Sequence, residues 1–232
     1  MTAGAPVLTA GFWRTRRSAA IAGIVFAVLL LAAMTMARIA LAESSFQALQ
    51  ADAQRRTLIR LSIGLVPFAG IAFLWFIGVV REQLGEVEDR LFSTVFMGSG
   101  LLFLAMLFGA TVTSASLLAM LAGQRANADV FAYGRDISQG YMSVYAMRMA
   151  AVFTISVSTA ARRTAALPRW VSYLGYLVAL VLLVAAGEHR WTQLVFPSWV
   201  LLVSLVILFV RPPNRVRRVE VGPDADTELG AQ

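Results

Sequence analysis

The sequence predicts an all-α fold, a polytopic bundle of six transmembrane helices. Of its 232 residues, 59% are hydrophobic and 14% are charged, whereas soluble domains carry about a quarter charged residues. The apolar residues lie in six long stretches, and short polar segments rich in Arg separate them. A run of about 20 apolar residues crosses the hydrocarbon core of a bilayer as a helix. We therefore expect lipid to surround the six stretches and water to contact mainly the connections between them.

The six expected spans follow one another along the chain with little between them. They cover residues 19–42, 58–80, 93–122, 140–161, 170–187 and 191–210. Trp170, Trp191 and Tyr141 fall at expected ends of spans, where amphipathic aromatic rings prefer the interface. The third span exceeds the usual length, so we expect it to tilt or to project from the bilayer.

The first span has a second interpretation as a cleaved signal peptide. Ala40, Leu41 and Ala42 have the small-x-small form of a processing site. The apolar run is longer than the usual signal-peptide core of about 7 to 15 residues. We therefore favour an uncleaved span.

The distribution of Arg predicts the orientation. With the N-terminus inside, twelve Arg lie on the cytoplasmic side and seven on the outer side or its flanks. Cytoplasmic connections are enriched in basic residues, so N-in, C-in is expected. The cytoplasmic set is Arg14, Arg16, Arg17, Arg81, Arg90, Arg162, Arg163, Arg169, Arg211, Arg215, Arg217 and Arg218; the outer set is Arg38, Arg55, Arg56, Arg60, Arg125, Arg135 and Arg190.

Little folded mass is expected outside the membrane. We expect a basic cytoplasmic N-terminus over residues 1–18, the transmembrane domain over 19–211, and a disordered cytoplasmic tail over 212–232, which turns polar and acidic. The two largest outer loops, 43–57 and 124–139, are candidates for surface helices.

Arg148 is the most informative residue, because it lies inside the fourth span. A charged group there costs free energy unless it snorkels or finds a partner. Tyr141 and Tyr145 precede it on the same helical face. The three could line a cavity that holds an anionic substrate or a lipid headgroup; alternatively, Arg148 snorkels outward or bonds helix carbonyls, which we favour.

Three hydroxyls of the third span are candidates for the same pocket. Thr111, Thr113 and Ser114 are expected at a depth comparable to that of Arg148. Hydroxyls within a span more often bond to carbonyls of their own helix or to a neighbouring helix, and we favour that role.

Small residues recur every four positions on two spans and predict close helix packing. They are Ala105, Gly109 and Thr113 on the third span, and Ala146, Ala150, Thr154 and Ser158 on the fourth.

Several absences bear on function. Cys and Lys are missing and His189 is the only His, so we predict no metal site and no cofactor. The net charge of +7 lies beside apolar spans, which favours orientation in a lipid bilayer over nucleic-acid binding. No Asp or Glu lies inside an expected span, which disfavours ion-coupled transport. An enzyme is disfavoured because no acid and base pair is evident.

Two segments resemble known sequences. The stretch Leu167, Pro168, Arg169, Trp170 and Val171, followed by a span, a turn with Pro197 and a last span, resembles uncharacterised six-span bacterial membrane proteins. The stretch 76–81 (FIGVVR), with 88–90 (EDR) and 97–100 (MGSG), is similar to membrane proteins of actinobacteria. The resemblance implies a cell-membrane location and a six-helix layout, but no activity and no functional residue.

The functional expectation is a non-enzymatic accessory or scaffold subunit of a cell-envelope assembly, with other membrane proteins as partners. The alternative is a small carrier or binding protein for a lipid or an anionic metabolite that uses Arg148.

Overall fold

The computed structural model describes residues 9–41, 46–84, 90–123, 125, 127–164, 167–185 and 191–209, and every regular element within these ranges is helical. Five stretches are long and apolar enough to cross a membrane, and α7 is a shorter apolar helix. The expected class, an all-α multi-pass membrane protein, is confirmed at this level. The elements are α1 (Thr9–Leu41), α2 (Phe46–Ala51), α3 (Ala53–Leu84), α4 (Arg90–Ala122), α5 (Ala128–Gln139), the π-helical segment η2 (Gly140–Ala146), α6 (Met147–Thr164), α7 (Arg169–Val184) and α8 (Thr192–Phe209).

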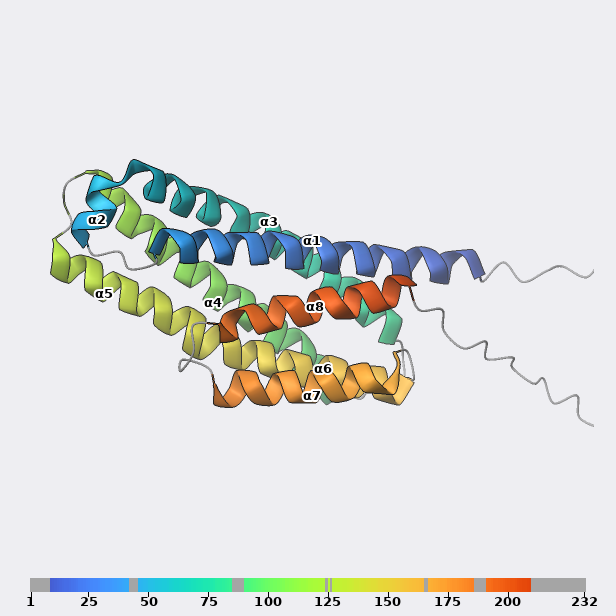
Figure 1. Ribbon diagram of the computed structural model, residues 1–232. Helices are drawn as coiled ribbons and strands as arrows, with labels where there is room; N and C mark the ends of the chain where they lie inside the picture. Colours follow the sequence, from blue (N-terminus) through green and yellow to red (C-terminus); the bar gives the residue numbers. More distant parts are fainter. Residues whose placement is uncertain are drawn as a thin grey trace, which may run out of the picture.

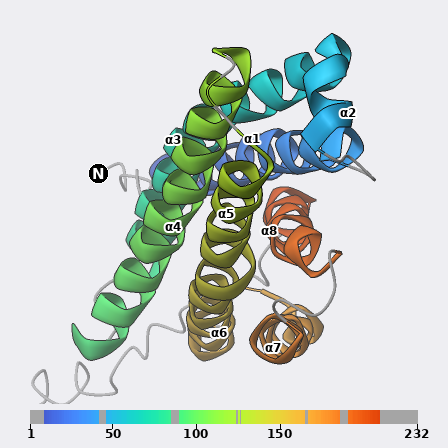
Figure 2. The ribbon, with the colours of Figure 1, turned by 90° about the vertical axis from the view of Figure 1, so that its left-hand side faces the viewer.

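The long helices run back and forth between two ends of one bundle (Figure 1). The described chain begins with α1 and finishes with α8 at the same end, which we call the terminal end; α2 lies at the other, which we call the α2 end. α8 packs between α1 and α7, and α6 packs against α4 and α7 (Figure 2). The tail expected over 212–232 and residues 1–8 of the N-terminal segment lie outside the described residues.

Phenylalanine rings fill the centre of the bundle. Phe73 of α3 is fully buried, and its ring centroid lies 4.5 Å from that of Phe26, 5.3 Å from Phe103, 5.1 Å from Phe153 and 6.0 Å from Phe196. These rings come from α1, α4, α6 and α8, so a single cluster joins five helices. Since α1 supplies Phe26 to its centre, α1 is part of the core.

Two glycines let helices cross closely. A Cβ at Gly23 of α1 would collide with Ser204 Oγ of α8 and would lie 2.9 Å from the Phe76 ring. A Cβ at Gly175 of α7 would collide with Ser158 Oγ of α6. Within the described residues both serine hydroxyls are buried and lack a hydrogen-bond partner. Their oxygens lie against glycine backbone, where Cα–H groups are weak donors.

The two predicted packing seams have different outcomes. On the helix formed by η2 and α6 all four residues are buried, and Ala146, Ala150 and Thr154 are completely so. The prediction is therefore confirmed there. On α4, Ala105 is exposed, so the prediction is wrong at that position: the helix turns this residue outward and packs through its larger side chains, such as Phe103 and Leu107.

A second, smaller core lies at the α2 end. It is built from Ala40, Leu49, Ile59, Leu118, Leu121 and Phe131, and the Phe46 ring of α2 lies 5.9 Å from that of Phe131 on α5. We call α2, α5 and the adjoining ends of α1, α3 and α4, which supply this core, the head. Both loops that the sequence analysis expects on the outer side contain a helix, α2 in 43–57 and α5 in 124–139. α5 continues through η2 into α6.

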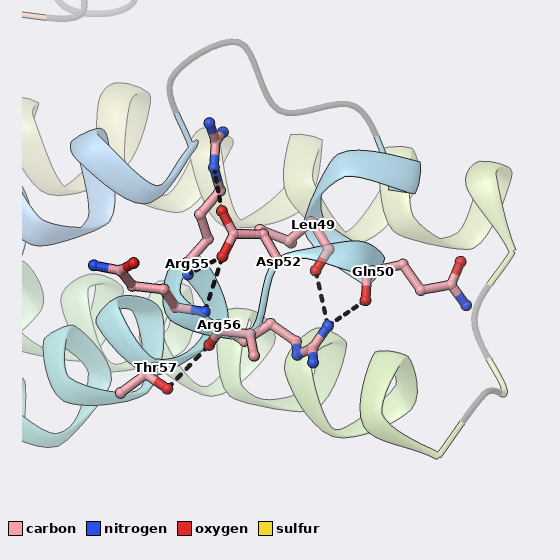
Figure 3. Close-up of polar contacts among 8 residues, drawn as sticks. Leu49, Gln50, Asp52, Arg55, Arg56 and Thr57 are labelled. Carbon is pink, nitrogen blue, oxygen red and sulfur yellow. Dashed lines mark hydrogen bonds and ion pairs between the residues drawn. The ribbon is translucent and has the colours of Figure 1, made fainter.

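Asp52 explains why α3 begins before the expected start of the second span at residue 58. Its Oδ1 accepts from the backbone N–H groups of Gln54 (2.9 Å) and Arg55 (3.1 Å), and its Oδ2 accepts from Arg55 Nε at 3.1 Å. The cap satisfies N–H groups that the first helical turn leaves free. Arg56 in turn donates to the carbonyls of Leu49 and Gln50 at the end of α2 (Figure 3).

This corner is expected to loosen only in acid. The hydrogen bonds from Arg55 and Gln54 hold the pKa of Asp52 below its ordinary value of 3.8. A lowered pKa in the folded state stabilises the fold above the unfolded pKa and stops doing so as the pH falls through the folded one. The rate of hydrogen exchange in the peptide containing Gln54 and Arg55, corrected for its intrinsic pH dependence, should rise only when the pH is below the ordinary pKa of 3.8. The Asp52→Asn variant should lack this acid step; an identical step in the variant would show that another group causes it.

Candidate functional site

Arg148 lies on the exposed face of α6. Its Nη1 donates to the carbonyl of Val144, one turn back along the helix, at 3.0 Å. Of the two interpretations that the sequence leaves open, this geometry matches the bond to a helix carbonyl, not a position inside a cavity. The hydrogen bond points the guanidinium toward the α2 end, as expected for a helical side chain that leans toward the N-terminus of its helix.

Tyr141 and Tyr145 of the π-helical segment are exposed, as Arg148 is. Tyr145 is 59% exposed and Tyr141 is 36% exposed. The ring of Tyr141 lies beside α4, 3.6 Å from the position of a Cβ on Gly109. The three residues therefore form a row along the outside of the helix rather than the wall of an enclosed pocket.

The three hydroxyls of α4 bond to their own helix. Thr111 donates to Leu107 O at 2.8 Å, Thr113 to Gly109 O at 2.9 Å, and Ser114 to Ala110 O at 2.9 Å. Ser114 also lies 2.9 Å from Ser138 Oγ of α5, and Ser138 donates to the same Ala110 carbonyl. Their role in the structure is to satisfy backbone carbonyls and to join α4 to α5.

Arg148 and these hydroxyls lie at different heights in the bundle. Tyr141 is level with Gly109, and Phe153 is level with Gly100, where a Cβ would lie 3.2 Å from its ring. Arg148 is consequently level with α4 near Leu104. Thr111 lies about seven residues further along α4, which is about 10 Å at 1.5 Å per residue. The structure does not bring the proposed pocket together.

A different polar group joins three helices at the α2 end of the bundle. Arg38 of α1 donates from Nη2 to Gln193 Oε1 of α8 at 3.2 Å, and Gln193 donates from Nε2 to Ser143 Oγ of η2 at 2.6 Å. The Arg38 guanidinium carbon also lies 5.4 Å from the centre of the Trp191 ring, within the range of a cation–π contact. We call Arg38, Gln193 and Ser143 the relay.

The π-helical segment places Ser143 in the relay. A π turn holds an extra residue compared with an α turn, so it changes which side chains face the neighbours. In η2 Ser143 and Ala146 are buried, while Tyr141 and Tyr145 stay on the outside. Such segments often occur at functional sites, and this one lies where α5 of the head passes into α6.

Sequence analysis missed the relay because its members are far apart in the chain. Gln193 and Ser143 are separated by 50 residues, and Arg38 and Gln193 by 155. Arg38 was counted only among the charges of the outer side and its flanks. A usable signal was the position of Gln193, a polar amide near the start of an apolar span, because amides at such sites often bond across helices.

The relay predicts a modest but coupled contribution to stability. Gln193→Leu removes the acceptor of Arg38 and the donor to Ser143, and should lower the free energy of unfolding in detergent by about 1 kcal/mol. Ser143→Ala should cost less. Because both changes break the same hydrogen bond, the double variant should lose less than the sum of the two losses. Strict additivity would contradict a bonded Gln193 and Ser143.

Comparisons of the chain with protein-family models, with curated proteins and with solved structures show no match.

Proposed function

We propose that this protein is a six-pass protein of the cell membrane with both termini in the cytoplasm, and that it serves as a non-enzymatic accessory or scaffold subunit of a cell-envelope assembly. Kinship with the six-span membrane proteins of actinobacteria that it resembles is part of this proposal. The support comes from the exposed surface, from the distribution of Arg and from the head.

The surface of α3 supports a membrane position. Its exposed side chains are polar up to Arg60, apolar from Leu61 through Phe68 to Trp75, and charged again at Arg81. Arg60 and Arg81 lie 21 residues apart, which is about 31 Å along the helix and close to the thickness of the hydrocarbon core.

Two other helices match this thickness. Arg17 and Arg38 lie 21 residues apart on α1. Tyr141 and Arg162 also lie 21 residues apart on the helix formed by η2 and α6, and the π-helical part makes this distance somewhat shorter. α7 has 16 residues and is about 24 Å long. A helix of this length spans the bilayer where the hydrocarbon core is locally thinner than average. With α7 counted, there are six crossings, and the excess of Arg at the terminal end favours a cytoplasmic location for that end.

The head is the single observation that carries the accessory role. It has its own core, and α3 and α5 expose polar side chains there, so in this placement it is a folded structure on the outer side. Its exposed surface includes Tyr133, which is 70% exposed, and charged residues such as Asp129, Arg135 and Asp136 on α5. Exposed aromatic and Arg side chains are typical of protein interfaces.

The carrier alternative has weaker support. The candidate hydroxyls bond to their own carbonyls and lie about 10 to 15 Å along α4 from the level of the Arg148 backbone. A carrier for an anionic metabolite would need these groups to converge on one enclosed site.

Affinity purification from native membranes in a mild detergent tests the accessory role. The wild-type chain should retain a stoichiometric membrane partner, identified by mass spectrometry. A head variant with Tyr133→Glu and Arg135→Glu should release it while keeping the wild-type melting temperature. As a matched control, Gln54→Glu adds a negative charge to an exposed head residue of α3 instead of α5. This variant should retain the partner if the partner contacts α5. Recovery of the wild-type chain alone, in every mild detergent, would contradict the proposal.

A further inference from the structure

We propose that Arg148, with Tyr145 and Tyr141, binds the phosphate of an anionic membrane phospholipid on the lipid-facing surface of α6. This inference rests on the membrane placement proposed above but not on the accessory role. A lipid held on the surface needs no enclosed cavity, unlike the ligand of a carrier.

The depth of Arg148 creates the need for such a partner. In the membrane placement Tyr141 marks the boundary of the hydrocarbon, and Arg148 lies seven residues further in along the helix formed by η2 and α6. Its side chain is exposed there. A guanidinium that faces hydrocarbon is unfavourable unless it reaches a polar or anionic group.

The guanidinium keeps donors available for a ligand. It carries five N–H groups, and within the described part of the chain its hydrogen bond is to Val144 O alone. No ion pair of Arg148 with a described carboxylate exists; the described ion pairs are Arg55 with Asp52 and Arg135 with Asp136. A planar guanidinium can bind two phosphate oxygens at once.

The tyrosines extend the site toward the headgroup region. Tyr145 lies about one turn from Arg148, and Tyr141 about one turn beyond it, both on the exposed face. Their rings suit the interface and their hydroxyls can donate to headgroup oxygens. Level with Arg148, exposed Leu102 and Ala105 of α4 offer apolar surface to an acyl chain.

The position favours a lipid phosphate over a soluble anion. A soluble anion would have to lose its hydration and enter hydrocarbon to reach Arg148, which is strongly unfavourable. A phospholipid already has its phosphate at the interface, about one side-chain length away. Because the guanidinium carries a full positive charge in a medium of low dielectric constant, a lipid with net negative charge is preferred over a zwitterionic one.

Lipid binding to the purified full chain tests the proposal. The protein in detergent is titrated with phosphatidylglycerol or with phosphatidylcholine of the same acyl chains, and bound lipid is counted by native mass spectrometry. Wild type should prefer phosphatidylglycerol, and Arg148→Met should weaken that binding about tenfold. Arg135→Met, a control that removes an exposed Arg from the head, should bind as wild type does.

Two further measurements keep the proposal testable. If Arg148→Met also loses the wild-type melting temperature, Tyr145→Phe replaces it; this variant loses only a hydroxyl and should weaken binding about threefold. Inorganic phosphate at the same concentration should not displace the lipid. Unchanged binding by a folded Arg148→Met, equal binding of phosphatidylcholine, or displacement by inorganic phosphate would each overturn the proposal.

Discussion

Gly23→Leu is expected to prevent α1 from packing against α3 and α8. A Cβ at Gly23 would already meet Ser204 Oγ and the buried Phe76 ring, and a leucine adds three more carbons where no space exists. Overpacking of this kind should lower the free energy of unfolding by at least about 3 kcal/mol. Thermal unfolding in detergent, followed by tryptophan fluorescence and gel filtration, measures the effect.

The matched control for this change is Gly78→Leu on α3. Gly78 is exposed, and nothing lies within 4 Å of the position of its Cβ. The control adds the same side chain to a surface that faces hydrocarbon, so its melting temperature should stay close to that of wild type. If the two variants were equally stable, α1 would not pack as described.

Phe73→Ala is expected to produce the second large loss. Phe73 is completely buried, and its ring contacts rings from four other helices. When a membrane protein unfolds, its separated helices stay in hydrocarbon, so the substitution changes the transfer free energy of the side chain little. The destabilisation therefore comes from the cavity and from the lost ring contacts. We expect a decrease of about 2 to 3 kcal/mol in the free energy of unfolding.

Phe68→Ala tests whether this loss comes from the core. Phe68 is on the same helix as Phe73 and is 63% exposed. The same truncation at this position removes a ring from the lipid-facing surface, so the cost should stay below about 0.5 kcal/mol. A comparable loss at Phe68 would show that α3 is turned differently in the bundle.

The class and the course of the helices could be predicted from the sequence because they depend on local properties. Hydrocarbon requires each backbone amide to bond within its own segment, so apolar length alone indicates a helix. The four-residue spacing from Ala146 to Ser158 correctly predicted a packed face, since that periodicity places small residues on one side of a helix.

The direction of a face and contacts over long sequence separations could not be predicted. The spacing of Ala105 and Gly109 resembles that of the buried α6 seam, yet Ala105 is exposed, because helix rotation is set by all neighbours together. The depth of Thr111 relative to Arg148 depends on how α4 and α6 pair. The relay between Arg38 and Gln193 requires both the fold and the π turn of η2.

The placement of the six crossings is the central claim, and cysteine labelling tests it most directly. The chain has no Cys of its own, so single cysteines can be introduced at Ala132 in the head, at Leu74 on the exposed face of α3, and at Arg169 at the terminal end. A membrane-impermeant maleimide should label Ala132→Cys in intact cells and Arg169→Cys only after lysis, and should leave Leu74→Cys unlabelled in both. Labelling of Arg169→Cys in intact cells, or of Leu74→Cys in either preparation, would contradict this placement.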